Sequence, residues 1–181
     1  MPKSITIGEI LNKEQYVQVT GNEDALKRPI YVAEINRPGF ELAGFFKHSD
    51  FRRIIIFGDK ESAFISEMSE ARQREIFPFL VNDEVPCIII AKGNECPPIL
   101  MEIAKEREFP IFVTEVSTGR VSIELTSILD EALAPETLIH GVFLNIYGKG
   151  VIIKGDSGIG KSEIALELVK RGHLLVADDA V

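Results

Sequence analysis

Cysteine and long apolar runs are scarce in this chain of 181 residues. Its two cysteines, Cys87 and Cys96, are too few for a disulfide-stabilised scaffold or a zinc-binding knuckle. Cys87 lies in the apolar run 85–91, which favours a buried thiol. No stretch approaches the roughly 20 apolar residues that a membrane helix needs, and residues 1–15 lack the apolar core and cleavage site of a signal peptide. These absences predict a cytoplasmic protein without a membrane span.

Basic residues are also in the minority. The chain carries 20 Lys and Arg against 28 Asp and Glu, which gives a net charge of −8 and a pI near 5.0. Nucleic acids and anionic membranes are themselves negative, so this balance disfavours both as partners. A hydrophobic fraction of 45% and a charged fraction of 27% are ordinary for a globular protein and exclude a disordered or collagen-like chain.

Strand-like apolar runs alternate with helix-like segments over most of the chain. Such alternation is typical of a sheet covered on both faces and at least partly parallel. It predicts an α/β fold in which a mixed or parallel sheet is flanked by helices. We expect strands at 30–35, 53–57, 87–91 and 111–114, one or two helices within 60–80, and further helices from Pro97 and over 117–133.

A domain boundary is expected near residue 134. There the alternation ends at Pro135, and two strand-like runs follow around a glycine turn, at 138–147 and 150–154. The first part holds 15 basic and 22 acidic residues and the second part 5 and 6, so the acidity belongs mostly to the first. We assign 1–133 to an N-terminal α/β domain and 134–181 to the start of a second domain.

Residues 155–162 match the phosphate-binding loop pattern G-x-x-x-x-G-K-[ST] at every required position. Glycines let the backbone curl so that consecutive N–H groups point at phosphate oxygens, and the following helix adds its positive N-terminus. Lys161 supplies a charge that can reach the β- and γ-phosphates, and the Ser162 hydroxyl is a hard oxygen ligand suited to Mg²⁺. We therefore expect a phosphate-bearing ligand at Gly155, Asp156, Ser157, Gly158, Ile159, Gly160, Lys161 and Ser162.

The segments on either side of the loop support this interpretation. Residues 151–153 are typical of a strand, and 163–171 of a helix with its apolar face at Ile164 and Leu168, which Gly172 would end. The alternative is a glycine-rich turn with a solvated lysine, which requires neither a strand before it nor a helix after it.

Three further residues are candidates for the site, but the residues alone do not decide their roles. Asp178 and Asp179 follow an apolar run that could lie beside the strand before the loop. A carboxylate there could hold Mg²⁺ or accept a proton from an attacking hydroxyl, but a solvated acidic turn explains the pair equally well. His140 lies among apolar neighbours, which favours a core histidine over a site residue.

The sequence GDSGIGKSE, followed by KRGH and then ADD, is a far more specific pattern than the general phosphate-binding loop. Together with the rest of residues 139–181, it closely resembles the bacterial HPr kinase/phosphorylase family. The segments EINRPGFELAGFF (34–46), RIIIFG (53–58), PCIIIAKG (86–93) and LAPETLIHG (133–141) match the same family's N-terminal domain and linker. The resemblance covers essentially the whole chain.

The resemblance implies an enzyme that uses ATP and Mg²⁺ to phosphorylate a serine of HPr, a small carrier protein of the sugar phosphotransferase system, and so regulates carbon metabolism. It also implies the reverse removal of that phosphate by phosphorolysis with inorganic phosphate. In addition, it implies a first domain similar to part of the Mur ligases and an assembly into homo-oligomers, commonly hexamers.

The resemblance also implies roles for individual residues. Family residues matching 155–162 bind ATP, the one matching Ser162 contacts Mg²⁺, and those matching His140 and Lys161 belong to the active site. The residue matching Asp179 is the general base for the kinase and the general acid for phosphorolysis. For His140, the resemblance reverses the preference for a core histidine, and for Asp178-Asp179 it decides a choice that the residues alone left even.

The family's kinase domain continues well beyond the position of Val181. Its remainder holds another acidic Mg²⁺ ligand and the stretch that meets HPr. A piece of 48 residues is below the length at which most chains form an independent core. We therefore expect an incomplete kinase domain here, and a chain that is weakly active or inactive by itself.

Two other functions are compatible with a phosphate-binding loop. A small-molecule kinase or a nucleotide switch would bind nucleotide without transferring phosphate to HPr. A regulatory or oligomerising module that is not an enzyme would transfer no phosphate at all.

Overall fold

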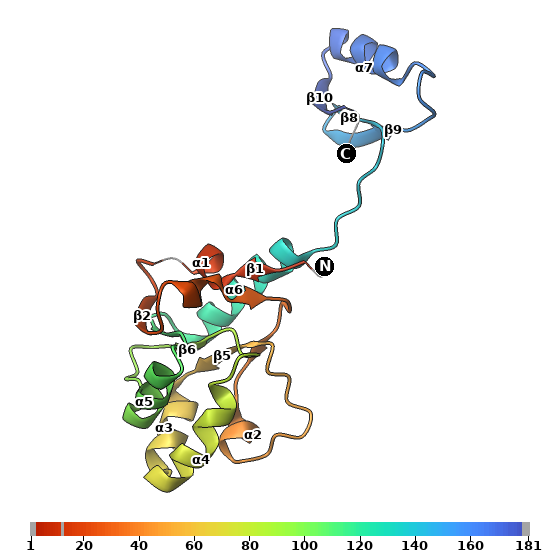
Figure 1. Cartoon of the computed structure of the whole chain (residues 1–181). Helices are drawn as coiled ribbons and strands as arrows, with labels where there is room; N and C mark the ends of the chain where they lie inside the picture. The colour runs from red at the N-terminus through yellow and green to blue at the C-terminus, as the bar shows by residue number, and fades with distance from the viewer. Residues whose placement is uncertain (1–2, 12, 179–181) are drawn as a thin grey trace. The chain divides into compact units, whose positions relative to one another are not determined.

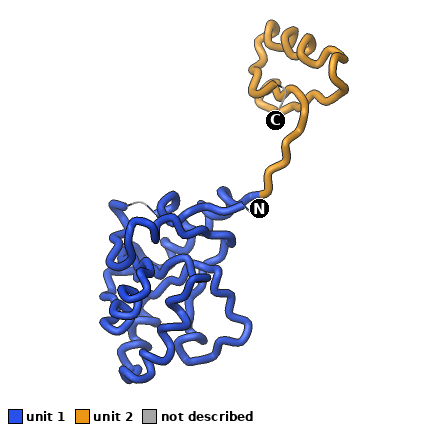
Figure 2. Tube along the Cα trace, in the orientation of Figure 1, with its two compact units in different colours: residues 1–134 blue, residues 135–181 orange. Residues whose placement is uncertain are grey.

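A computed structural model describes residues 3–11 and 13–178. The chain divides into two compact units, Met1–Ala134 and Pro135–Val181, which are coloured separately in Figure 2. The sequence placed the boundary after residue 133, within one residue of this division. Each unit has its own sheet and its own buried cluster.

Unit 1 is built on a five-stranded mixed sheet of order β2-β7-β6-β5-β4 (Figure 1). Four strands run parallel to their neighbours, and the edge strand β2 (Val17–Thr20) pairs antiparallel with β7. The α/β class and the mixed, helix-flanked sheet predicted from the sequence are confirmed. The parallel strands are β4 (Ile35–Asn36), β5 (Ile54–Phe57), β6 (Ile88–Ile90) and β7 (Ile111–Val113).

Helices cover both faces of this sheet because successive residues of a strand point to opposite faces. Ile55 and Phe57 pack in one buried cluster with the helices of residues 39–106, and Ile54 and Ile56 pack in the other with the first and last helices of the unit. The helices are α1 (Ile7–Ile10), the 3₁₀ helix η1 (Asp24–Lys27), α2 (Gly39–Leu42), α3 (Asp59–Glu67), α4 (Glu70–Leu80), α5 (Pro98–Glu106) and α6 (Thr118–Leu133).

The strand predicted at 30–35 is wrong, because this apolar run serves two sheets. Its beginning belongs to β3 (Pro29–Ile30), which pairs with β1 (Ile5–Thr6) in a small separate sheet. Its end belongs to β4 of the main sheet. Between them Tyr31 is 46% exposed, since the chain leaves one sheet before it joins the other.

The cysteine prediction holds for Cys87, which is fully buried beside the main sheet. Burial raises the pKa of its thiol to about 12, because an apolar environment disfavours the thiolate. Cys87 is therefore a small core residue, unsuited to nucleophilic chemistry.

Unit 2 consists of a three-stranded sheet and one helix. The strands β8 (Val142–Ile146), β9 (Lys149–Ile153) and β10 (Leu174–Ala177) lie in the order β10-β8-β9, with antiparallel neighbours throughout. Helix α7 (Lys161–Lys170) follows the predicted loop. The sheet pairing differs from the expectation that the strand before Asp178 would lie beside β9, since β8 separates the two.

The core of unit 2 is small. Val142, Leu144 and Ala165 are its buried members, and Leu168 packs against them. The apolar face predicted for α7 is thus right at Leu168 and wrong at Ile164, which is 52% exposed. Large apolar side chains remain on the surface of this unit, at Leu166, Leu174, Leu175 and Val176 among others.

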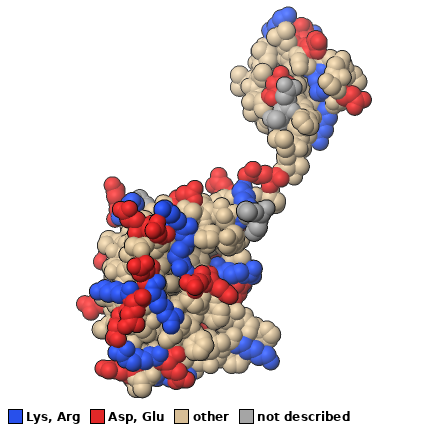
Figure 3. Space-filling model, viewed as in Figure 1, with Lys and Arg blue, Asp and Glu red and all other residues tan. Residues whose placement is uncertain are grey.

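The surface of the chain is charged and mixed. In Figure 3, basic and acidic side chains are interspersed over the visible face of unit 1, and no single sign dominates it. Across residues 3–11 and 13–178, the helices are all too short or too polar to cross a bilayer.

Candidate functional site

The phosphate-binding loop connects β9 to α7, the strand-to-helix context that its sequence predicted. Gly158 and Gly160 have φ angles of 79° and 99°, in the left-handed region that glycine adopts without strain. Gly160 is the N-cap of α7, and its carbonyl accepts a hydrogen bond from the Ile164 N–H at 3.1 Å. The loop backbone therefore turns back on itself directly before the positive end of a helix of ten residues.

Several backbone donors of the loop have no acceptor among the described residues. The Ile159 N–H reaches the Asp156 carbonyl at 3.4 Å. The N–H groups of Ser157, Gly158 and Gly160 donate to no other described residue. Together with the unpaired first N–H groups of α7, these donors fit an anion such as a phosphate group.

Lys161 holds its ammonium group on the loop. Its Nζ donates to the carbonyls of Gly155 and Asp156, at 2.8 Å in each case. These bonds close the loop across its base and keep the positive charge beside the unpaired N–H groups. The arrangement is thus suited to neutralising a polyphosphate.

Ser162 fits the expected role of a metal contact only in part. Its side chain is exposed at the start of α7 and has no hydrogen-bond partner in the described part of the chain. However, no group of three or more His, Cys, Asp or Glu there could hold a metal ion.

His140 lies at the same edge of the sheet as the loop. It is exposed and precedes β8, so the alternative of a core histidine is wrong. Val142, two positions after His140, pairs with Ile153, two positions before Gly155. The pairing of β8 with β9 thus leaves both predicted site residues at the same edge of the sheet.

Asp178 reaches this edge from the third strand. β10 pairs with the first half of β8, with Ala177 opposite Phe143, so the chain leaves β10 beside the beginning of β8. β9 and β10 run parallel on either side of β8, and their carboxyl ends therefore lie at one edge. Asp178 is exposed there, whereas Asp179, the expected general base, lies outside the described residues.

Gly141 is a residue of this edge that the sequence interpretation missed. A Cβ atom at Gly141 would lie 2.7 Å from the Ile153 carbonyl oxygen, closer than real Cβ contacts come. Glycine is therefore required for β8 to start so near the end of β9. The only signal in the sequence is the dipeptide His140-Gly141 before an apolar run, which does not reveal the close approach.

Comparisons with known proteins agree with this geometry. The family profile described as HPr Serine kinase N terminus matches residues 5–129, and the HPr Serine kinase C-terminal domain matches residues 131–181. The chain belongs to the HPr serine kinase family. Its two family domains meet within a few residues of the boundary between the two units.

Relatives named HPr kinase/phosphorylase match this family member over nearly its whole length. The protein from Streptococcus gordonii is 42% identical over 98% of this chain, and one from Bacillus cereus (strain AH820) is 40% identical over 100%. The chain spans 57% and 58% of the lengths of these two relatives.

A solved structure resembles the chain more weakly. The CBS and DRTGG domains of the regulatory region of Clostridium perfringens pyrophosphatase, complexed with the activator diadenosine tetraphosphate, align with a TM-score of 0.45 and 15% identity. The alignment covers 69% of this chain and 48% of that one, and we infer nothing about function from it.

Proposed function

We propose that the protein transfers the γ-phosphoryl group of ATP to a serine of HPr, and that it also removes this phosphate by phosphorolysis with inorganic phosphate. The observation that carries the proposal is the edge of the unit 2 sheet, where the loop of 155–162, His140 and Asp178 come together. The family and the names of the relatives support HPr as the substrate.

The loop holds the phosphates in this proposal. Its unpaired N–H groups and the N-terminus of α7 accept the phosphate oxygens, and Lys161 neutralises the β- and γ-phosphates. Ser162 contributes a hydroxyl to Mg²⁺, which when bound supplies further charge neutralisation. Phosphoryl transfer depends mainly on such charge neutralisation and alignment.

Asp179 acts on the proton of the reacting hydroxyl. In the kinase direction, Asp179 accepts the proton of the HPr serine as its oxygen bonds to phosphorus and the bond to ADP breaks. In phosphorolysis the same carboxyl group returns a proton to the departing serine oxygen. His140, which lies two positions before the first paired residue of β8, belongs to the active site in this proposal.

The proposal also covers the location of the protein, its assembly and the activity of the 181 residues by themselves. We place the protein in the cytoplasm, as a homo-oligomer, with a hexamer as in the family, and with a role in regulating carbon metabolism. We also propose that the 181 residues by themselves are a poor catalyst. Exposed apolar side chains of unit 2 support this, such as Leu174 at 66% and Val176 at 56%. A sheet whose apolar side chains are left exposed is only partly packed, so it holds the residues of its site less rigidly.

The test uses the full product of the gene, incubated with HPr and ATP·Mg²⁺ and analysed for phosphoserine by mass spectrometry. Lys161→Ala and Asp179→Asn should each lower the transfer rate by about a hundredfold or more, since each removes a group that acts in the transition state. Lys170→Ala, at the exposed end of the same helix, is the matched control and should transfer at the wild-type rate.

Three outcomes would overturn parts of the proposal. A normal rate in Asp179→Asn would remove this residue from the role of base. ATP binding without any phosphoserine on HPr would favour a nucleotide switch or a small-molecule kinase instead. Calorimetry with ATP tests the proposal that the 181 residues by themselves are a poor catalyst. Tight ATP binding by this chain would contradict a loosely held site.

A further inference from the structure

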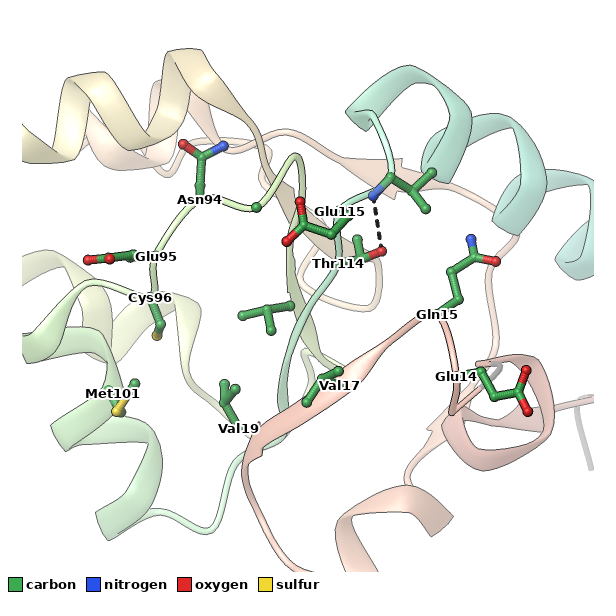
Figure 4. A pocket seen from close by; sticks show the side chains of 13 residues that line it. Glu14, Gln15, Val17, Val19, Asn94, Glu95, Cys96, Met101, Thr114 and Glu115 are labelled. Carbon is green, nitrogen blue, oxygen red and sulfur yellow. Dashed lines mark hydrogen bonds between the residues drawn. The ribbon is translucent and has the colours of Figure 1, made fainter.

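Unit 1 contains a hollow that the proposed reaction does not use. It lies between the edge strand β2, β7 and α5, and has a volume of about 590 Å³ (Figure 4). Its apolar lining includes Val17 and Val19 of β2, Val113 of β7 and Met101 of α5. The volume is within the range of sites that bind small molecules, and the apolar lining is typical of them.

The polar side of the hollow is formed in advance by two loops at the carboxyl ends of β6 and β7. The Lys92 N–H donates to the Val116 carbonyl and the Gly93 N–H to the Thr114 carbonyl, both at 3.0 Å. Lys92 and Gly93 have φ angles of 64° and 66°, so the first loop turns sharply over the hollow. Because these N–H groups are already paired, the loop offers no cradle for a phosphate group, unlike residues 155–162.

The charge of the hollow is negative. Its thirteen lining residues include three glutamates and neither lysine, arginine nor histidine. The nearest lysine in the sequence, Lys92, does not line the hollow, because its ammonium pairs with Asp59. Glu115 extends over the hollow in Figure 4, whereas the carboxylates of Glu14 and Glu95 point away from it.

The Glu115 carboxylate lies close to the backbone of Gly93 but has no hydrogen-bond or ion-pair partner among the described residues. A Cβ atom at Gly93 would lie 2.6 Å from Glu115 Oε2, so the carboxylate packs against the bare backbone of the glycine. In the described part of the chain, no hydrogen bond or ion pair reaches this carboxylate. An unpaired carboxylate at the margin of an apolar surface attracts a cation that also has an apolar part.

Thr114 adds a hydrogen-bond donor to the lining of the hollow. It is 4% exposed, and its hydroxyl accepts a hydrogen bond from the Val116 N–H at 3.2 Å, drawn dashed in Figure 4. The hydroxyl proton has no acceptor among the described residues. A buried hydroxyl of this kind can donate to an oxygen of a ligand.

We infer that this hollow binds a small organic cation, an ammonium or guanidinium group on an apolar body, with its charge at Glu115 and its body on the β2–β7 floor. A metal ion is disfavoured, because one carboxylate over an apolar floor does not make a coordination shell. A phosphate is disfavoured by the paired N–H groups and by the sign of the charge. The site lies wholly in unit 1 and does not depend on the proposed kinase reaction.

The test compares three probes with a phenyl group on a short chain: 2-phenylethylammonium, the anion 3-phenylpropanoate and the neutral 3-phenylpropan-1-ol. Each is titrated into ¹⁵N-labelled 181-residue chain, and the amide signals of Gly93, Glu115 and Val116 are followed by NMR. The cation should shift these signals at the lowest concentration, the alcohol should bind more weakly, and the anion should leave them unchanged. The preference for the cation should fall at 0.5 M salt.

Variants separate the charge from the shape of the site. Glu115→Gln should weaken the cation about three- to fivefold and leave the alcohol unchanged, as for a partly exposed ion pair. Glu67→Gln, at the exposed end of α3, is the control and should change neither. Val17→Phe should block the cation and the alcohol, because Val17 lines the hollow and its 56% exposure leaves room for a larger side chain.

Three results would overturn the inference. Equal binding of the cation and the anion, or an unchanged affinity for the cation in Glu115→Gln, would exclude selection by charge. Shifts confined to signals outside the loops after β6 and β7 would place the probe elsewhere. Binding that survives Val17→Phe would exclude the hollow.

Discussion

Asp50 shows how a single carboxylate makes the stability of unit 1 depend on pH. Its oxygens accept hydrogen bonds from Nε and Nη2 of Arg52, at 2.9 and 2.8 Å, and from the Arg52 backbone N–H at 3.1 Å. The Arg52 side chain is the main cause that lowers the pKa of Asp50 from 3.8 to about 2. A pKa below that of the unfolded chain means that the folded state favours the charged form.

The expected effect of Asp50→Asn therefore depends on pH. The stabilisation by Asp50 is fully present above pH 4 and is lost as the pH falls from about 4 to 2. Because Arg52 is 60% exposed, we expect the variant to lose about 1 kcal/mol of unfolding free energy at pH 7, and almost nothing at pH 2. Urea denaturation at both pH values measures this.

Asp130→Asn, on the exposed side of α6, is the control for the Asp50 substitution and should leave the pH profile unchanged. If Asp50→Asn lowered the unfolding free energy by the same amount at both pH values, the carboxylate would act through its shape and not through its charge.

At the scale of single residues, the sequence predicts local roles and misses distant partners. Gly158, Gly160 and Lys161 are recognisable because one contiguous pattern contains the whole loop. Thr20 is not recognisable: its buried hydroxyl donates to the Phe109 carbonyl at 2.8 Å and accepts from the Ile111 N–H at 3.1 Å. These partners lie about 90 positions away, and nothing near Thr20 in the sequence indicates them.

At the scale of elements, periodicity identifies helices and buried strands but not strand order. The helices α3 to α6 lie where the apolar spacing predicts them. The sequence allows β10 to lie beside β9, but β10 pairs with β8, because strand order depends on side-chain packing between distant elements. The short strand β2 was missed, since its residues Val-Gln-Val-Thr have no long apolar run.

The start of β8 gives a prediction at this scale. Gly141→Ala would place a methyl group against the Ile153 carbonyl and force β8 and β9 apart where the loop begins. We expect a loss of about 1–3 kcal/mol in the stability of this strand pair, measured by amide hydrogen exchange of residues 142–153, and weaker binding of phosphate-bearing ligands.

Gly119→Ala provides the control for the Gly141 substitution. No atom lies within 4 Å of its added methyl group, and alanine favours a helix, so it should be neutral or stabilise α6 by up to about 1 kcal/mol. Unchanged exchange in Gly141→Ala would show that the two strands can separate there without cost.

At the scale of the whole molecule, the two units differ in how well they are packed. Unit 1 has two buried clusters on the two faces of its sheet, and unit 2 has one cluster with three buried members. The segment between them, residues 135–140, has no regular secondary structure, and Leu138 within it is 70% exposed. Unit 1 therefore has the contacts to fold without unit 2.

Limited proteolysis tests this independence. Thermolysin, which cuts before large apolar residues, should cleave ahead of Leu138 and release a stable fragment of unit 1, identified by its mass. Amide exchange in β5, β6 and β7 should be the same in the fragment and in the intact chain. Cleavage within the main sheet at a similar rate would contradict the expected independence.

The sequence predicts a domain boundary near residue 134 because a proline and the end of the strand–helix alternation mark it locally. It could not indicate the hollow of unit 1, whose lining comes from four separate segments: residues 14–19, 93–96, Met101 and 113–116. A site built in this way becomes visible only when the strand order β2-β7-β6 is known.

The phosphate-binding loop and α7 together form the connection between β9 and β10, residues 154–173. Closing such a connection costs conformational entropy before β10 can pair with β8. A ligand that fixes the loop removes part of this cost in advance, so ligand binding and strand pairing favour each other by the same free energy. The phosphate-bearing ligand that we propose for this loop would thus also stabilise the fold of unit 2, because it would favour the pairing of the last strand of its sheet.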